Sequence, residues 1–224
     1  MARYLILGAG KFGRLALERL GQEDKEAAFL VVDRNPQALQ GLQGLTYAVV
    51  DVEATEAAAF LTARLHQGAA WDWIIPAVPE HVAFAWLRAG PLAGPDWEVV
   101  ATPPELAGLT QVAVRGREGE LYLSRALHSC PDDCAEPKVC PVTGEDRETS
   151  LYEELAALHV PDYFIAVIAS RQLAPGVGGY APERLLALAR ELTGREEKIL
   201  VATACRCHGV AHALRRRAGG SIGF

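Results

Sequence analysis

The first 129 residues of this 224-residue chain contain no cysteine, although the chain has five. The cysteines form two groups, with Cys130, Cys134 and Cys140 in the first and Cys205 and Cys207 in the second. Cysteines that only fill space in a core would be spread along apolar strands and helices. These cysteines lie in polar segments that contain proline and glycine. Their positions therefore indicate a site built on loops.

Other absences narrow the class of protein. No apolar run approaches the roughly 20 residues of a membrane-crossing helix, so we expect no membrane insertion. The amino terminus lacks the long apolar region of a signal peptide, which favours a cytoplasmic location. There, structural disulfides are rare, and the cysteines are expected to be free, metal-bound or redox-active. The net charge of −6 gives no basis for binding nucleic acid. We expect the basic run at residues 215–217 to close a helix and to complement its dipole.

The amino-terminal half carries a dinucleotide-binding pattern. A short apolar strand at residues 4–7 leads directly to Gly8, Gly10 and Gly13. Helical spacing follows, and Gly21 is expected to end that helix. In this motif the first glycine permits a tight turn, the second lets the backbone approach a pyrophosphate, and the third allows close packing of helix and strand. The alternative is a domain of the same shape that has lost its ligand.

An acidic residue follows at the distance that the motif requires. A second strand at residues 28–32 ends at Asp33, 20 residues beyond Gly13, where a carboxylate binds the ribose hydroxyls. Asp33 favours NAD over NADP because a carboxylate repels a 2′-phosphate. The adjacent Arg34 leaves NADP open, since a guanidinium can accept that phosphate.

Alternating strands and helices continue to about residue 100. We predict strands at 46–50, ending at Asp51, and at 73–75 and 97–100, with helices at 53–66 and 80–88. This alternation predicts an α/β fold, a Rossmann-type parallel sheet with helices on both faces. The predicted domains are a dinucleotide-binding domain at 1–102 and a smaller α/β region at 103–224 with a cysteine-rich insertion at about 124–150.

Residues 3 to about 90 resemble the nucleotide-binding domains of the TrkA-N or RCK type, which regulate potassium channels and transporters. The resemblance rests on the glycine motif, on residues 32–36, on Val50 and Asp51, and on the turn at 75–79. It implies NAD(H) binding, with the first acid on the adenosine ribose and the second near the adenine. Beyond residue 100 the chain departs from that family. Residues 128–209 resemble uncharacterised bacterial proteins that join a TrkA-N-like Rossmann domain to a cysteine-rich tail. The predicted cofactor-binding residues are Gly8, Gly10, Lys11, Phe12, Gly13, Asp33, Arg34, Asp51, Ala77 and Val78.

The carboxyl-terminal half contains its own strand and helix units. We predict strands at 111–114, 120–123, 164–169 and 199–202, a helix from Pro182, and a closing helix from about Val210. The glycine-rich segment at 176–179 is expected to be an anion cradle or a plain flexible turn.

The thiols leave three interpretations open. The first is a metal ion or iron–sulfur cluster, although the spacing matches neither a zinc knuckle nor a ferredoxin. The second is a redox thiol pair or reactive cysteine, in which a helix amino terminus and Arg206 lower the thiol pKa. The third is ordinary structural cysteines. The metal interpretation requires the two groups to meet in space. Its predicted ligands are Cys130, Cys134, Cys140, Cys205, Cys207 and His208.

Together these patterns predict an NAD(H)-binding protein with a cysteine-ligated metal ion, zinc or an iron–sulfur cluster, in a redox, oxidoreductase-like role. The alternative is a non-catalytic NAD(H)-responsive sensor with structural zinc or redox thiols. The expected partners are a small-molecule dinucleotide, a second copy of the chain in a homodimer, or a redox or regulatory protein.

Overall fold

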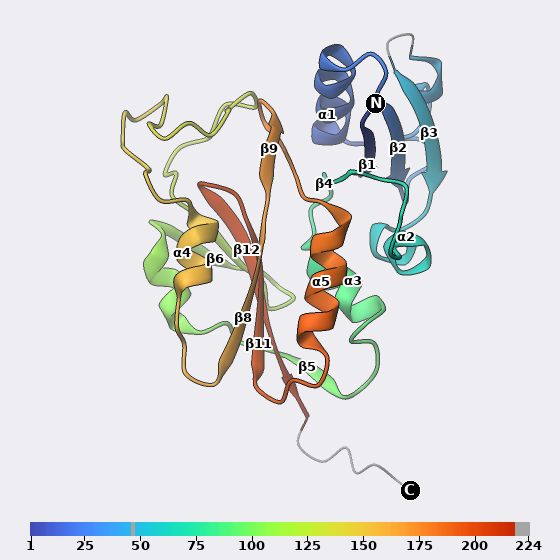
Figure 1. Ribbon diagram of the computed structural model, residues 1–224. Coiled ribbons are helices and arrows are strands. Elements are labelled where there is room, and N and C mark those ends of the chain that lie inside the picture. The colour runs from blue at the N-terminus through green and yellow to red at the C-terminus, as the bar shows by residue number, and fades with distance from the viewer. Residues whose placement is uncertain (46–47, 218–224) are drawn as a thin grey trace, which may run out of the picture.

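The two largest of the three β-sheets organise the chain, one parallel and one largely antiparallel (Figure 1). The computed structural model describes residues 1–45 and 48–217. The first sheet is parallel, in the order β3-β2-β1-β4. Its strands are β1 (Arg3–Leu7), β2 (Ala28–Asp33), β3 (Val49–Ala54) and β4 (Trp73–Pro76).

Helices cover both faces of the parallel sheet. Because successive side chains of a strand point to opposite faces, Leu5 and Ile6 pack into different cores. Ile6 packs with Leu17 of one helix, and Leu5 packs in the core that contains Phe60 of another. The predicted α/β fold with a Rossmann-type sheet is therefore confirmed. The helices are α1 (Lys11–Glu23), α2 (Ala57–Arg64) and α3 (Val82–Ala89), and the 3₁₀ turn η1 (Leu42–Gly44) precedes β3.

α1 does not end at Gly21 as predicted, but continues to Glu23. Gly21 is buried in the helix. One glycine costs a helix only about 1 kcal/mol, which packing of the apolar face readily offsets.

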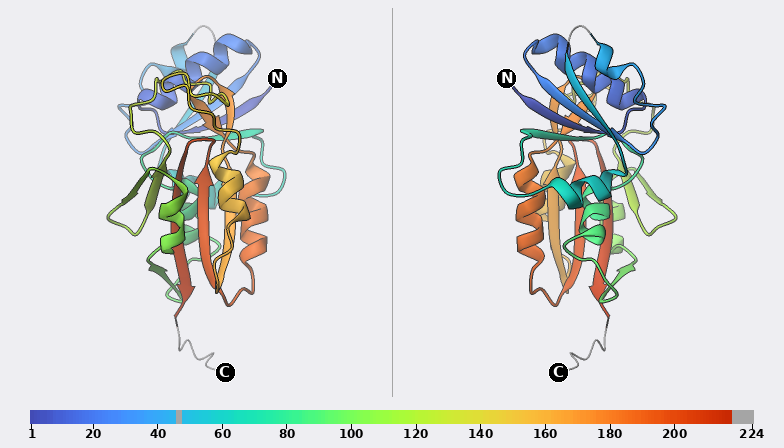
Figure 2. Two further views of the ribbon diagram at one scale, coloured as in Figure 1. Left: turned by 90° about the vertical axis from the view of Figure 1, so that its left-hand side faces the viewer. Right: turned by 90° about the vertical axis from the view of Figure 1, so that its right-hand side faces the viewer.

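The larger sheet follows the order β6-β7-β12-β11-β8, and β5 also pairs with β12. Only the β8–β11 pair is parallel. Figure 2 shows the parallel sheet set at one end of this larger sheet. The strands are β5 (Trp97–Val100), β6 (Val112–Arg115), β7 (Leu121–Ser124), β8 (Tyr163–Ala169), β11 (Lys198–Ala204) and β12 (His208–Arg216).

The two faces of the larger sheet belong to different cores. On one face, Leu185 packs with Ile199 and Val201 in the core that the parallel sheet shares. On the other, Leu151 and Leu155 pack against alternate residues of β11 and β12. The covering elements are α5 (Pro182–Leu192) on the first face and η2 (Pro104–Leu109) and α4 (Leu151–Ala157) on the second. Among the described residues, none of the helices combines the length and apolarity that a membrane crossing requires.

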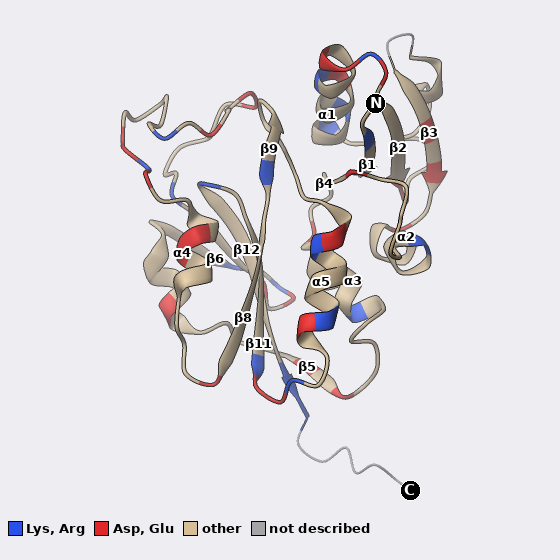
Figure 3. Cartoon of the chain, viewed as in Figure 1, with Lys and Arg blue, Asp and Glu red and all other residues tan. Residues whose placement is uncertain are grey.

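The predicted strand at 97–100 is present but belongs to the larger sheet, and the predicted closing helix is a strand of that same sheet. Trp97–Val100 is a strand, but it pairs antiparallel with β12 rather than extending the parallel sheet. The predicted closing helix is the strand β12, which lies inside the sheet. A short apolar run does not distinguish a buried strand from a helix by its periodicity. The basic run therefore complements no helix dipole: Arg215 pairs with Glu98 and Arg216 with Glu196. Figure 3 shows the carboxyl-terminal end of β12 in the blue of basic residues.

The glycine-rich segment is neither an anion cradle nor a plain flexible turn, but a β-hairpin of β9 (Arg171–Ala174) and β10 (Val177–Gly179). This hairpin joins the parallel sheet, because Tyr180 exchanges two backbone hydrogen bonds with Ile74 of β4, of 2.9 and 3.0 Å. A Cβ atom at Gly179 would lie 2.9 Å from the Ile74 carbonyl oxygen. The glycine thus serves close approach of two backbones.

A buried histidine pair links the two sheets. His81, just before α3, and His212 of β12 share a hydrogen bond of 3.0 Å between their Nδ1 atoms. His81 Nε2 lies 3.0 Å from the Thr203 hydroxyl of β11. The two imidazoles are 5 % and 4 % exposed. Burial lowers the pKa of His81 to about 3 and that of His212 to about 4, so both rings are neutral near pH 7.

Candidate functional sites

The turn between β1 and α1 has the geometry of a dinucleotide-binding turn. Gly8 has a φ of +109°, which favours glycine, and a Cβ there would lie 2.7 Å from the Ala77 carbonyl oxygen. A Cβ at Gly13 would lie 1.8 Å from the Gly8 carbonyl oxygen, so helix and strand meet only with glycine here. Gly10 faces open space, since a Cβ there would have nothing within 4 Å. The free N–H groups at the start of α1 are therefore open to an anion.

A cavity of about 250 Å³ lies at the carboxyl edge of the parallel sheet. Asp33 holds the turn beside it, since its carboxylate accepts hydrogen bonds from the Ala9 and Asn35 N–H groups at 2.7 and 2.8 Å. Burial, and then Glu56, raise the pKa of the Glu80 carboxyl group in this cavity. The remaining lone pairs of Asp33 suit sugar hydroxyl groups. The cavity is lined by Val32, Asp33, Arg34, Glu56, Ala57, Val78, Pro79 and Glu80.

The prediction that Asp51 ends the third strand is wrong. β3 runs from Val49 to Ala54, and Asp51 lies opposite Leu30 in its middle with an exposed side chain. Because the strand extends to residue 54, α2 begins at Ala57 instead of at residue 53. Two residues of the predicted strand, Thr46 and Tyr47, lie outside the described residues. The acid at the end of β3 is Glu53, which the sequence pattern did not single out.

Lys11 and Phe12 face the cysteine-rich segment rather than the cavity at Asp33. The Lys11 ammonium lies 2.5 Å from the Asp132 carboxylate, and Arg19 donates to the Asp132 carbonyl oxygen at 3.0 Å. The Phe12 side chain lines the second cavity, described next. The start of α1 therefore contacts the cysteine-rich segment and the second cavity.

The two cysteine groups meet in space. A cavity of about 270 Å³ receives thiols from both groups, with the imidazoles of His128 and His208. Cys130 Sγ lies 3.7 Å from His208 Nε2, and Cys140 Sγ lies 4.0 Å from His128 Nε2. Hydrogen bonds from Thr143 lower the pKa of the Cys140 thiol, whereas burial raises that of Cys130. Four cysteines line this cysteine cavity: Cys130, Cys134, Cys140 and Cys207.

A buried cation completes the cysteine cavity. Arg147 is 7 % exposed, and its Nη1 donates to Cys207 Sγ at 2.8 Å. Its Nη2 is buried and has no hydrogen-bond partner among the described residues. Burial raises the pKa of Cys207, and Arg147 partly offsets that increase. A buried guanidinium requires negative charge nearby, and the Glu145 carboxylate lies 3.6 Å from Arg147 Nη2.

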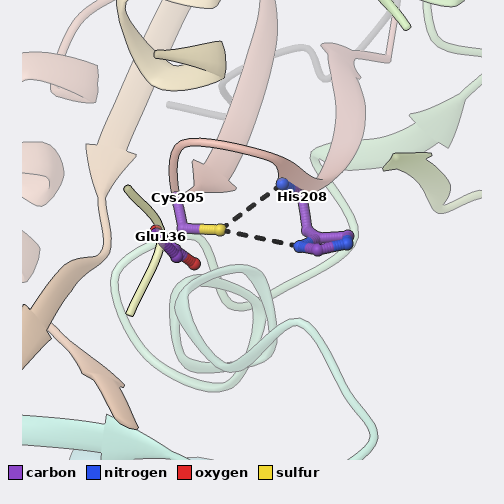
Figure 4. Close-up of side chains that lie close together, drawn as sticks. All are labelled: Glu136, Cys205 and His208. Atoms are coloured by element: carbon purple, nitrogen blue, oxygen red, sulfur yellow. Dashed lines mark hydrogen bonds between the residues drawn. The ribbon is translucent and has the colours of Figure 1, made fainter. Parts of the chain in front are cut away.

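Cys205 stands apart from this cavity. Its Sγ lies 3.9 Å from His208 Nδ1 and accepts the His208 backbone N–H at 3.4 Å, and the Glu136 carboxylate lies beside it (Figure 4). Burial, and then Glu136, raise the pKa of the Cys205 thiol. The predicted activation of this thiol by a helix dipole and Arg206 is therefore wrong. The residues after it form a strand, and the Arg206 guanidinium donates to carbonyl oxygens.

Direct hydrogen bonds fix the long cysteine-rich segment. Arg206 donates to the carbonyl oxygens of Glu136 and Arg147 at 3.0 and 2.8 Å. The Cys134 carbonyl oxygen accepts from the Gln172 side chain and the Gly176 N–H at 2.8 and 2.9 Å. These hydrogen bonds tie the segment to the β11–β12 turn and to the β9–β10 hairpin.

Arg206→Lys is expected to loosen this segment, because an ammonium cannot reach both carbonyl groups at once. Loss of about one net hydrogen bond corresponds to a roughly tenfold larger equilibrium constant for local opening of the segment. Limited proteolysis between residues 131 and 149 measures it, with Arg117→Lys on the β6–β7 turn as the control. Equal cleavage rates in the two variants would show that Arg206 does not hold the segment.

Two functional candidates, Glu136 and Arg147, carry no motif that the sequence pattern could reveal. Each reaches its partner across about 60 to 70 residues of chain. The one signal in the sequence is the position of Glu136, two residues after Cys134.

Two family models match the chain, over ranges that overlap at residues 70–80. Residues 4–80 match the TrkA-N domain, and TrkA-N domains are nucleotide-binding domains that in general bind NAD(H). Residues 70–217 match a family described as "Uncharacterized protein, C-terminal domain". An "Uncharacterized protein" of Archaeoglobus fulgidus is 32% identical over 219 residues, which cover 95% of this chain and 99% of that protein. No solved structure matches the chain.

The first part of the chain is thus a nucleotide-binding TrkA-N domain. The chain as a whole belongs to the family defined by this C-terminal domain, here preceded by the TrkA-N domain. The predicted resemblance, a TrkA-N domain joined to an uncharacterised tail, is confirmed.

Proposed function

We propose that this protein binds NAD(H) at the carboxyl edge of its parallel sheet and has a redox role. In this role the cysteine cavity holds a metal ion or an iron–sulfur cluster. The observation that carries the proposal is the cavity itself, which gathers four thiols and a buried guanidinium against Phe12 of the dinucleotide-binding helix.

The residues around the first cavity favour NAD(H) over NADP(H). Asp33 ends β2 in the position of a ribose-binding carboxylate. Glu56 and Glu80 line the same cavity, and Arg34, the one cation there, is 3.6 Å from Glu56. A 2′-phosphate would therefore meet three carboxylates and an arginine that is already paired.

The chemistry of the cysteine cavity suits a thiolate-bound centre. Four cysteines are the usual ligands of iron–sulfur clusters, and such clusters transfer electrons. Arg147 would offset part of the negative charge of the thiolates and donate a hydrogen bond to one of them. Hydrogen bonds to cysteine sulfur are among the features that tune such centres.

Metal and acid-labile sulfide analysis of anaerobically purified protein tests the proposal. We expect bound metal in the wild type and in Ser129→Ala, a control beside the first cysteine group, and its loss in Cys134→Ser. Equal iron and sulfide would identify a cluster, and zinc without sulfide a structural or Lewis-acid role. Full metal content in Cys134→Ser would contradict the assignment of the first group.

A second candidate is a non-catalytic NAD(H) sensor, favoured by the contacts between α1 and the cysteine-rich segment. Lys11 and Arg19 hold residue Asp132 beside the start of α1, where a dinucleotide phosphate is expected. A bound phosphate would compete for Lys11 and shift the segment. Hydrogen exchange at residues 130–134 should then change when NADH is added, although no NADH is oxidised. Such a change would support this candidate.

A further inference from the structure

Glu136, Cys205 and His208 form a compact group of metal-binding side chains beside the cysteine cavity (Figure 4). One ligand atom from each lies within 4.8 Å of the other two, and no other such group of three occurs among the described residues. Zinc takes sulfur at about 2.3 Å and nitrogen or oxygen at about 2.0–2.2 Å, which sets its ligands roughly 3.3–3.8 Å apart. The 3.9 Å from Cys205 Sγ to His208 Nδ1 is close to that range.

We propose that these three side chains bind one divalent metal ion at a site separate from the four cavity thiols, with a fourth coordination position open. The inference rests on the proposed function in one respect, since it assigns Cys130, Cys134, Cys140 and Cys207 to the other centre. Cys205 and His208, which the sequence placed in that centre, belong instead to the separate site, where Glu136 is the third ligand.

The backbone presets two of the three ligands. Cys205 and His208 flank the tight turn between β11 and β12, which is closed by the Cys205 N–H donating to the His208 carbonyl oxygen at 2.9 Å. The His208 N–H in turn donates to the Cys205 sulfur. The thiol and the imidazole therefore face each other before any ion binds.

Glu136 is held in place at a cost in backbone energy. Its φ of 51° lies in the left-handed region, which costs a residue other than glycine about 1 kcal/mol or more. Arg206 fixes it there, since its N–H donates to the Glu136 carboxylate at 3.2 Å and its Nε to the Glu136 carbonyl oxygen. A strained residue that directs a carboxylate at a thiol and an imidazole is typical of a functional position.

The second nitrogen of His208 has the partner that a metal-bound imidazole requires. A histidine that binds metal through one nitrogen donates its other N–H to an acceptor that fixes the ring. With Nδ1 toward Cys205, Nε2 lies 3.7 Å from the sulfur of Cys130. Cys130 thus orients the ligand of one site while it lines the other.

The charge and number of the three side chains indicate which ion binds and what occupies its fourth coordination position. One thiolate and one carboxylate neutralise a divalent cation, and the mixed sulfur, nitrogen and oxygen set suits zinc. Three protein ligands leave one position for water or an oxygen atom of a substrate, as in catalytic zinc sites. Glu136 and His208 line the cysteine cavity, so that position opens toward it.

The cavity thiols do not form an equivalent site. Within the described residues, no three of their sulfur atoms lie within 4.8 Å of one another, whereas tetrahedral zinc requires all four to be close. The wider arrangement suits a centre with several metal atoms. We therefore expect the two ligand sets to bind different metals.

Cobalt titration tests the inference, because a thiolate bound to Co²⁺ gives visible absorption. Co²⁺ alone is added anaerobically to reduced, chelator-treated protein, and bound metal is counted after dialysis. Glu136→Gln is the matched isosteric change, and Glu148→Gln in the same exposed segment is its control. Glu136→Gly is the second variant, since glycine accepts the backbone conformation, and thermal unfolding verifies that each variant is folded.

We expect one equivalent of Co²⁺ to bind at least tenfold more weakly to Glu136→Gln, Glu136→Gly and Cys205→Ser than to the wild type. Glu148→Gln and Cys134→Ser should bind that equivalent with wild-type affinity. Loss of the same equivalent in both Cys134→Ser and Cys205→Ser would overturn the inference, because the thiols would then share one centre. Wild-type protein that binds no Co²⁺ at this site would also overturn it. The proposed function is judged separately, by the iron and sulfide of the protein as purified.

Discussion

Gly13→Ala is expected to destabilise the amino-terminal sheet by about 3 kcal/mol or more. The new Cβ would lie 1.8 Å from the Gly8 carbonyl oxygen, and neither α1 nor β1 can retreat without opening its core. Denaturant unfolding measures the loss of free energy, and NADH fluorescence measures the accompanying loss of binding.

Gly10→Ala separates folding from binding at the same turn. Nothing lies within 4 Å of the new Cβ, and the φ of −74° is ordinary for alanine. We expect a stability change of under about 1 kcal/mol but weaker NADH binding, because the Cβ occupies the space of the pyrophosphate. Unchanged NADH affinity in Gly10→Ala would contradict the placement of the phosphates at this turn.

The second large effect is a loss of stability in mild acid through His81 and His212. Burial holds their folded-state pKa values at about 3 and about 4, whereas an unfolded histidine titrates near 6.5. Below that pH the unfolded chain takes up protons that the folded protein excludes, so stability is complete above about pH 6.5 and falls as the pH decreases. The slope is about 1.4 kcal/mol per pH unit for each ring.

The groups around the pair determine the size of this effect. His81 faces His212 and the Thr203 hydroxyl, and His212 Nε2 lies 3.9 Å from the Glu120 carboxylate, which favours protonation of His212 and reduces its share. His81→Asn should lower the slope of unfolding free energy between pH 6.5 and 4.5, and His159→Gln on the surface should not. An identical slope in His81→Asn and the wild type would show that other groups govern acid unfolding.

The parallel sheet was predictable because its signals are local. Gly8, Gly10 and Gly13 follow a buried strand directly, and Asp33 lies at a fixed distance along the chain. β12 was not predictable in this way. Its alanines and leucine also suit a helix, and only its position between β7 and β11 makes it a strand.

The candidate metal sites show the same limit. Clustered cysteines in polar loops indicated a site, but their meeting depends on the β11–β12 turn and on the packing of the cysteine-rich segment against α1 and the β9–β10 hairpin. The sequence around Arg147 and Glu136 does not indicate their roles, because their hydrogen-bond partners lie 60 and 70 residues away along the chain. Asp51 was misplaced because a strand end cannot be located to within a few residues from sequence.

The proposed redox role requires the dinucleotide and the cysteine cavity to act together. Anaerobic mixing of the metal-containing protein with NADH and ferricyanide tests it most directly, since each NADH oxidised yields NAD⁺, a proton and two ferrocyanide ions. We predict catalytic loss of the nicotinamide absorbance in the wild type, and its absence in both Gly10→Ala and Cys134→Ser. NADH that binds to the wild type but is not oxidised faster than in Cys134→Ser would contradict the redox role and favour the sensor.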